Sequence, residues 1–218
     1  MYMKIELPKL QKVTRDDGTR YYVTPEGNKY PSVTTVLSEF KKKQLQRWRE
    51  RVGNEEADRI KQFSAKRGTK FHDLCENYLL NKPYTNDIGY MFDQFKPLLG
   101  RVRKIICLEQ HLYSDRLRVA GQMDCAGEFD NFPSIIDFKT SSKEKIREHI
   151  WDYFMQASAY SQMLLERTGI DIPMITILIS CEKPQGMTQI FVDKRDNWLR
   201  KFEELRYQYD ESLVVAQE

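Results

Sequence analysis

Two oppositely charged side chains lie almost side by side in an apolar run of the sequence, IIDFKTS at residues 135–141. A β-strand has a period of two, so Asp137 and Lys139 are expected to share one face of the strand with Ile135. An isolated pair of this kind is more often an ordinary ion pair on an edge strand than a reactive site. Other residues must therefore decide between the two interpretations.

A second acid, Asp124, occupies the middle of the preceding apolar run, GQMDCAGEF. Strand alternation is expected to place Met123, Cys125 and Phe129 on one face and Asp124 on the other. A carboxylate among apolar neighbours is costly unless it is paired or binds a metal ion. If the two runs form a β-hairpin, Asp124 and Asp137 are expected to converge near its far end.

Two carboxylates and a lysine that converge in this way would form a site for a hard cation with an ammonium group beside it. Oxygen ligands select Mg²⁺ or Mn²⁺ rather than Zn²⁺. Such an ion would bind a phosphate oxygen and lower the pKa of a water nucleophile. Lys139 would orient that water or stabilise the charge that develops at phosphorus.

Three weaker signals accompany this set. In RGTKFHDLCENYL, His72 and Glu76 are four residues apart and share one helix face. Gln156 and Tyr160 have the same spacing in QASAY. Glu109 is an acid in the apolar run that starts at residue 104, and an edge charge is as good an interpretation as a site role. A lone histidine is more often structural than a ligand, and a Gln–Tyr pair is more often a partly solvated helix face.

The ordered set of these motifs resembles the RecB-like branch of the PD-(D/E)XK nuclease superfamily. The four pieces are G-x-x-x-H at Gly68–His72, the acid Asp124, D-x-K at Asp137–Lys139 and Q-x-x-x-Y at Gln156–Tyr160. The stretches YPSVTTVLS, RGTKFH, MDCAGEF and IDFKTS are most similar to the exonucleases that maintain mitochondrial genomes and to their bacterial and phage relatives. The resemblance covers roughly residues 20–165.

The resemblance implies a role for each matching residue. Asp124 and Asp137 would bind the metal, Lys139 would be the catalytic lysine, and His72 would complete the metal site. The remaining implied site groups are the backbone carbonyl of Phe138, the helix pair Gln156 and Tyr160 facing the active site and the DNA, and, less certainly, Glu109. The implied activity is Mg²⁺- or Mn²⁺-dependent cleavage of DNA phosphodiesters, often from single-stranded ends, in replication, recombination or repair.

The cysteines bear on one variant of this family. Some members hold an iron–sulfur cluster on four cysteines, with one before the nuclease motifs and three after them. Here only Cys181 follows the Q-x-x-x-Y motif, so no iron–sulfur cluster is expected. The chain has four cysteines without metal-type spacing, which predicts buried free thiols: Cys75, Cys107, Cys125 and Cys181.

Basic residues near the motifs are candidate DNA contacts. KKKQLQRWRERVG, at 41–53, includes Arg47 and would neutralise phosphates, which we favour slightly over a merely solvated helix. Other candidates flank His72 or follow the catalytic strand, and they are Lys66, Arg67, Lys70, Thr140, Ser141 and Lys143. Ser32 is expected to cap a short helix, whose N-terminus would also suit a terminal phosphate.

The elements that must position these residues follow from periodicity and turn signals. Residues 11–30 are expected to form a β-hairpin that turns at Asp17 and Gly18, and VTTVLSEF a short helix after Ser32. A helical region interrupted at Gly53 and Gly68 is expected next, and Thr69 is a plausible N-cap. The predicted ranges are helices over 41–52, 54–66, 69–81, 86–103, 147–168 and 194–213, and strands over 104–114, 117–130, 134–140, 175–181 and 187–193.

This order predicts a layered α/β fold. The resemblance implies a restriction-endonuclease-like αβββαβ core, a central mixed sheet flanked by helices, with a helical N-terminal portion that includes a β-hairpin. We expect one nuclease domain over 1–218: a hairpin and helical part to residue 103, a sheet core over 104–192 and a C-terminal helix over 193–218. The length of 218 residues and the apolar content of 40% are sufficient for such a core.

Composition limits the remaining function classes. The net charge is only +3, so a nucleic-acid role rests on local clusters rather than on a global field. No run approaches the ~20 apolar residues of a membrane span, and the N-terminus has no signal or transit pattern, so a cytoplasmic protein is expected, bacterial or in a phage-infected cell. The expected partner is DNA, with replication or recombination proteins also possible. Two rival functions remain, a PD-(D/E)XK endonuclease and a catalytically silent DNA-binding accessory protein, beside an α/β scaffold whose charged strand residues only form ion pairs.

Overall fold

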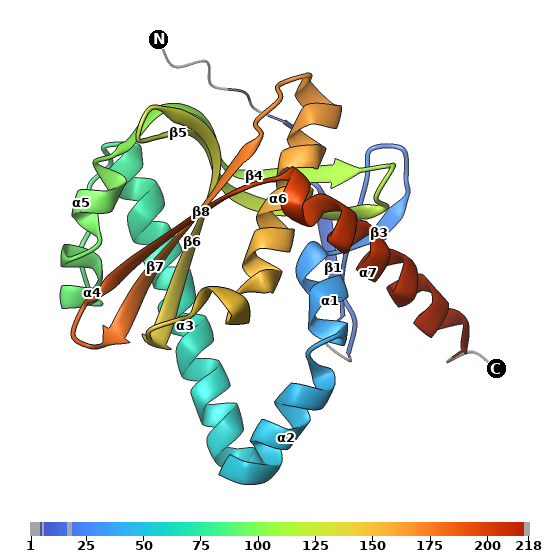
Figure 1. Cartoon of the computed structure of the whole chain (residues 1–218), viewed down its shortest axis with the longest axis horizontal. Coiled ribbons are helices and arrows are strands. Elements are labelled where there is room, and N and C mark those ends of the chain that lie inside the picture. The colour runs from blue at the N-terminus through green and yellow to red at the C-terminus, as the bar shows by residue number, and fades with distance from the viewer. Residues whose placement is uncertain (1–4, 6, 17–18, 216–218) are drawn as a thin grey trace.

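A five-stranded mixed sheet is the centre of the molecule (Figure 1). The computed structural model describes residues 5, 7–16 and 19–215. The strands lie in the order β4-β5-β6-β7-β8, and only β6 and β7 are parallel to each other. Their bounds are β4 Val102–Ser114, β5 Val119–Phe129, β6 Phe132–Lys143, β7 Met174–Lys183 and β8 Thr188–Lys194. The predicted mixed sheet is therefore confirmed.

Helices cover both faces of this sheet. The bounds are α1 Val33–Glu39, α3 Asn54–Leu79, α4 Tyr90–Asp93, α5 Lys96–Leu99, α6 Trp151–Thr168 and α7 Asp196–Val215. Buried side chains of α1, α6 and α7 form one apolar core with one face of the sheet. Those of α3, α4 and α5 form a second core with the other face. We call these the α6 core and the α3 core.

A smaller antiparallel sheet precedes the helices. It consists of β1 Gln11–Thr14, β2 Arg20–Val23 and β3 Lys29–Pro31. The predicted β1–β2 hairpin is confirmed by its pairing, whereas the turn predicted at Asp17 and Gly18 lies outside the described residues. The side chain of Ser32 accepts a hydrogen bond of 3.0 Å from the backbone N–H of Thr35, so its predicted cap of α1 is confirmed.

The helical region differs from the prediction in two places. Helix α2, Lys42–Val52, ends at Gly53 as predicted, but α3 runs without a break through Gly68. Thr69 donates to the carbonyl of Ala65 within the helix instead of capping a new one. Gly53 has a φ of 87°, which is incompatible with a helix and ends α2. Gly68 keeps a helical φ, and the low helix propensity of glycine only lowers the stability of α3 slightly there.

The helix predicted over 86–103 was also wrong. The segment forms only the short helices α4 and α5, and β4 already begins at Val102. Its apolar side chains, Met91, Phe92, Phe95, Leu98 and Leu99, are buried in compact turns against the sheet. Pro97, in the first turn of α5, lacks the N–H that a continuous helix would need.

Two further expectations can be compared with the fold. All four cysteines are buried free thiols, as predicted. None of the helices within the described residues is long and apolar enough to cross a membrane.

Candidate metal and phosphodiester site

The β5–β6 hairpin brings the two predicted acids together. Its ladder of paired residues ends at Cys125 and Ile136, so Asp124 and Asp137 are the next residues on each strand. The backbone N–H of Phe138 donates a hydrogen bond of 2.7 Å to Oδ2 of Asp124. The carboxylate of Asp124 thus replaces a backbone acceptor at the point where the strands separate.

Asp137 and Lys139 share one face of β6, as alternation predicted. Ile135 packs in the α6 core, whereas Ile136 and Phe138 pack in the α3 core. The Nζ of Lys139 lies 2.6 Å from Oδ1 of Asp137, whose side chain is 3% exposed. The other oxygen of this carboxylate is buried without a hydrogen-bond partner within the described part of the chain. A buried, unpartnered carboxylate oxygen is costly unless a cation or a ligand binds it.

The alternation predicted for β5 was wrong at Asp124. Met123 packs in the α6 core, but Cys125 and Phe129 pack in the α3 core. The alternation of β5 side chains is interrupted at Asp124, which lies opposite Glu109 of β4, and the φ of Glu109 is 47°. A positive φ at a residue other than glycine breaks the pleat. No feature of the sequence indicated this strained residue.

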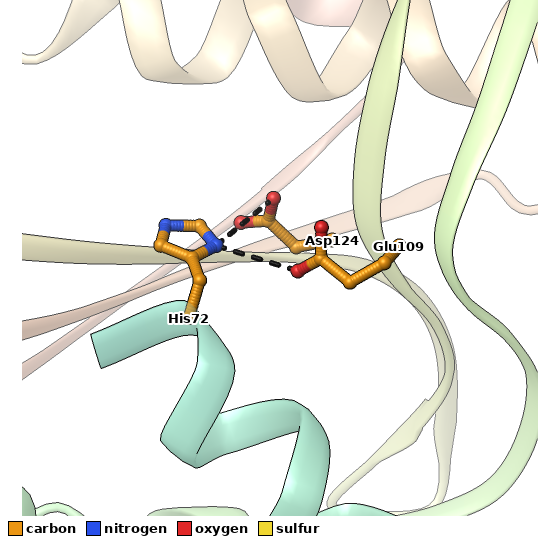
Figure 2. A group of neighbouring side chains, drawn as sticks. All are labelled: His72, Glu109 and Asp124. Carbon is orange, nitrogen blue, oxygen red and sulfur yellow. Dashed lines mark ion pairs between the residues drawn. The ribbon is translucent and has the colours of Figure 1, made fainter. Parts of the chain in front are cut away.

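Three side chains that could hold a metal ion, one of them Asp124, lie close together (Figure 2). The Nδ1 of His72, from α3, is 3.5 Å from Oδ1 of Asp124 and 3.5 Å from Oε1 of Glu109. One ligand atom from each of the three residues lies within 4.8 Å of the other two. Gln122 donates a hydrogen bond of 2.8 Å to Glu109 and so orients its carboxylate. We call His72, Glu109 and Asp124 the ligand cluster.

Burial and neighbouring charge shift the pKa values of these groups in opposite directions. Burial lowers the pKa of His72, but the carboxylates of Asp124 and Glu109 outweigh it and raise the pKa to about 9. Burial raises the pKa of Asp137 to about 6, against the opposing effect of Lys139. Burial also raises the pKa of Asp124. The carboxylates of Asp137 and Asp124 raise the pKa of Lys139 despite its burial, so its ammonium keeps its charge.

The donor set fits a divalent cation. The ligand cluster supplies one imidazole nitrogen and two carboxylates. Asp137 is not a member of this cluster, but one of its carboxylate oxygens is buried without a hydrogen-bond partner among the described residues. Metal ions in such sites need deprotonated ligands, and the raised pKa of His72 reflects the same excess of negative charge that would attract a cation. Carboxylate oxygens suit Mg²⁺, Ca²⁺ or Mn²⁺, whereas an imidazole nitrogen suits zinc, copper, iron or nickel, so the donor set by itself does not select one metal. The carbonyl of Phe138 stays a predicted ligand.

The pair Gln156 and Tyr160 lies deeper than the resemblance implied. The amide of Gln156 donates to the hydroxyl of Tyr160 at 3.5 Å, and Tyr160 is 3% exposed in the α6 core. A Cβ at Gly121 would lie 2.6 Å from that hydroxyl, so only glycine leaves room for it. That Gln156 and Tyr160 face an active site and DNA stays a prediction.

Tyr153 is a site residue that the sequence reasoning missed. Its ring lies on α6 with the Nζ of Lys139 5.2 Å from its centroid and the Nζ of Lys41 5.8 Å from it. It precedes Gln156 and Tyr160 by three and seven residues, which places all three on one stripe of the helix. That spacing was the available signal.

Some of the predicted DNA contacts are buried and others are exposed. Arg67 is buried, and it donates to Glu182 of β7 at 2.9 Å and to Thr140 of β6 at 3.4 Å. Ser141 is also buried and accepts from the backbone N–H of Lys143. Lys70 is exposed but paired with Asp87. Three other candidates are also exposed, namely Arg47, Lys66 and Lys143. Phosphate contacts by any of these residues stay predictions.

Known proteins similar to this chain are exonucleases by name. The chain is 29% identical over 149 residues to human mitochondrial genome maintenance exonuclease 1, which is 61% of this chain and 43% of that protein. The mouse protein of the same name is 27% identical over 150 residues, 61% of this chain and 44% of its own length. The chain therefore matches less than half the length of these curated relatives. No protein-family model matches the chain. The similarity supports a distant relationship to a genome maintenance exonuclease.

Proposed function

We propose that this chain is a Mg²⁺- or Mn²⁺-dependent DNA exonuclease of the RecB-like PD-(D/E)XK branch that hydrolyses phosphodiester bonds from single-stranded ends. The observation that carries the proposal is the ligand cluster, within 4.8 Å, beside the buried Asp137–Lys139 pair. In this proposal α3, β4, β5, β6, α6 and β7 are the αβββαβ nuclease core. The names of the human and mouse relatives support exonuclease action on DNA.

The chain's own residues would divide the work between binding and charge stabilisation. His72, Asp124, Asp137 and Glu109 would hold the ion, with the carbonyl of Phe138 as a further ligand. A divalent cation bound there would polarise a phosphate oxygen and lower the pKa of a nearby water. The N–H of Phe138 fixes Asp124, and Gln122 fixes Glu109, so the carboxylates are oriented before any substrate binds.

Lys139 would supply the positive charge beside the phosphate. Asp137 and the ring of Tyr153 hold its ammonium in place. A preorganised cation in a buried site stabilises negative charge developing at phosphorus more strongly than it would in water. Lys66, Arg47 and Lys143 would bind neighbouring phosphates, in a protein that acts in DNA replication, recombination or repair.

The proposal is tested by cleavage of end-labelled linear and circular single-stranded DNA, each with Mg²⁺, Mn²⁺ or EDTA. Metal-dependent loss of the linear DNA alone is expected. Lys139→Ala and Asp124→Asn should reduce the rate by at least ~100-fold, and Asp130→Asn, in an exposed ion pair with Arg101, is the matched control.

Two other outcomes would replace this proposal. Cutting of the circular DNA would identify an endonuclease. Binding of both DNAs without metal-dependent cutting would identify a DNA-binding accessory protein. The complete ligand cluster favours the exonuclease or endonuclease over the accessory protein.

A further inference from the structure

A groove of about 840 Å³ opens beside the ligand cluster. Glu109 belongs to both, and Gln122, which donates to Glu109, also lines the groove. Glu76, one turn of α3 beyond His72, lies on its wall as well. The groove therefore adjoins the ligand cluster at Glu109.

The walls come from three segments. The last turn of α3 supplies Leu79 and Leu80, and β4 supplies Ile105 and Leu108, all of them half-buried. Ile5, Leu7 and Lys9 lie beside the edge strand β4 as the opposite wall. Hydrogen bonds of 2.9–3.0 Å hold this wall there, from Ile5 to Ile106, Gln110 to Leu7 and Leu10 to His111.

Two lysines line the groove in addition to Glu76 and Glu109. Lys82 lies just past the end of α3, which extends roughly 10 Å beyond His72. Lys9 lies on the opposite wall. Neither lysine has an ion-pair partner among the residues that the structure describes. Apolar walls that end in unpaired ammonium groups suit a base and sugar followed by a phosphate.

We infer that this groove receives the terminal nucleotides of a DNA strand, on one side of the phosphodiester held at the ligand cluster. The inference rests on the proposed nuclease function and deepens it. A volume of about 840 Å³ is that of a small-molecule site, so it suits a few nucleotides of one strand and not a duplex. The groove would thus select strand ends rather than internal positions.

The test measures binding in EDTA, where no cleavage occurs. Oligo-dT carries 2-aminopurine at the 5′ end, the 3′ end or the middle, and its fluorescence is titrated with the full chain. We expect one terminal probe to respond more strongly than the middle probe. Lys82→Glu, which reverses a charge, and Leu80→Trp, which fills the groove, should each remove that response.

The same variants should discriminate between DNA topologies. Each should weaken binding of linear oligo-dT by roughly fivefold or more and leave a circular strand of the same length within about twofold. Lys96→Glu on α5 and Val13→Trp on β1 are the matched charge and size controls, because neither residue lines the groove.

The outcomes separate this inference from the proposed function. A response of the middle probe alone, or equal losses on linear and circular DNA, would overturn the groove assignment even if the enzyme cleaves DNA. Absence of metal-dependent cleavage by the unmodified chain would instead overturn the proposed function. Mn²⁺ affinity, measured by calorimetry, should be unchanged in Lys82→Glu.

Discussion

Lys139 keeps its charge in a buried site because three neighbours compensate for the lost water. Oδ1 of Asp137 lies 2.6 Å from its ammonium, Asp124 adds negative charge, and the ring of Tyr153 covers it. The pair is interdependent, since Asp137 is 2% exposed and its second oxygen has no hydrogen-bond partner in the part of the chain that the structure describes. Removing one member leaves the other as an uncompensated buried charge.

Lys139→Ala is therefore expected to destabilise the metal-free protein in a pH-dependent way. Without the lysine, the folded-state pKa of Asp137 rises further above its unfolded value of 3.8. The cost of an ionised Asp137 is absent below pH 3.8 and complete above the folded-state pKa. We expect a loss of roughly 3 kcal/mol at pH 8 and a smaller loss at pH 5, measured by urea unfolding in EDTA.

The control for this prediction is Arg101→Ala, which removes the partner of Asp130 in an exposed pair. Its effect should stay below about 1 kcal/mol at both pH values. An equal loss at pH 5 and pH 8 for Lys139→Ala would contradict the prediction, because it would mean that the ionisation of Asp137 does not matter.

His72 provides a second pH-dependent prediction. Its folded-state pKa of about 9 exceeds its ordinary value of 6.5, so its charged form stabilises the metal-free fold below pH 6.5. That stabilisation is lost as the pH rises to about 9. In EDTA the free energy of unfolding should fall by about 1–2 kcal/mol between pH 6.5 and 9, and His72→Asn should abolish most of that fall. Parallel curves for the two proteins would rule this out.

At the scale of elements, three segments fix the site. Helix α3 carries His72 and is joined to the sheet by buried Arg67, which contacts Glu182 and Thr140. The β5–β6 hairpin places Asp124 against the backbone of β6. Helix α6 packs Tyr160 against β5, where Gly121 leaves space for its hydroxyl. The position of each of these side chains therefore depends on packing between elements.

Gly121→Ala should disturb this packing. The new Cβ would lie 2.6 Å from the Tyr160 hydroxyl, and the buried ring has little freedom to move away. We expect a loss of about 1–3 kcal/mol in unfolding free energy, measured by urea denaturation. Gly68→Ala is the matched comparison, because a Cβ there meets open space within a helix. It should stabilise the protein by roughly 0.5–1 kcal/mol, and a loss of stability in both variants would argue against the steric explanation.

At the scale of the whole molecule, charge is distributed unevenly despite a net charge of only +3. Helix α2 is basic and exposed, and its preceding residue Lys41 is paired with Asp152 and lies over the rings of Trp151 and Tyr153. Since Tyr153 also contacts Lys139, the start of α2 is linked to the site through a single side chain. The start of this basic helix therefore lies close to Lys139.

Arg47→Ala should weaken DNA binding through electrostatics alone. If Arg47 contacts a phosphate, the slope of log K against log salt concentration should fall in magnitude by about one, with no preference for sequence. Fluorescence anisotropy in EDTA at several salt concentrations measures the slope. Arg200→Ala is the control, because Arg200 is exposed on α7. Equal slopes for both variants would remove Arg47 from the binding surface.

The sequence by itself determined the shared face of Asp137 and Lys139 and the order of most elements. Period-two alternation placed Asp137 and Lys139 on one face. Two neighbouring apolar runs made the β5–β6 hairpin, which brings Asp124 near Asp137, the natural hypothesis. These inferences succeeded because strand alternation and hairpin pairing depend on residues close in the chain.

Tertiary structure alone decided how the remaining groups meet. Tyr153 of α6 contacts Lys139 of β6, and Arg67 of α3 is buried against Glu182 of β7. Glu109 adopts a positive φ within β4. The continuity of α3 through Gly68 was decided in the same way, because packing of an amphipathic face outweighs the local propensity of one glycine. The sequence carried no periodic signal for Arg67 or Glu109, whereas the spacing of Tyr153 from Gln156 and Tyr160 was a signal that the sequence did offer.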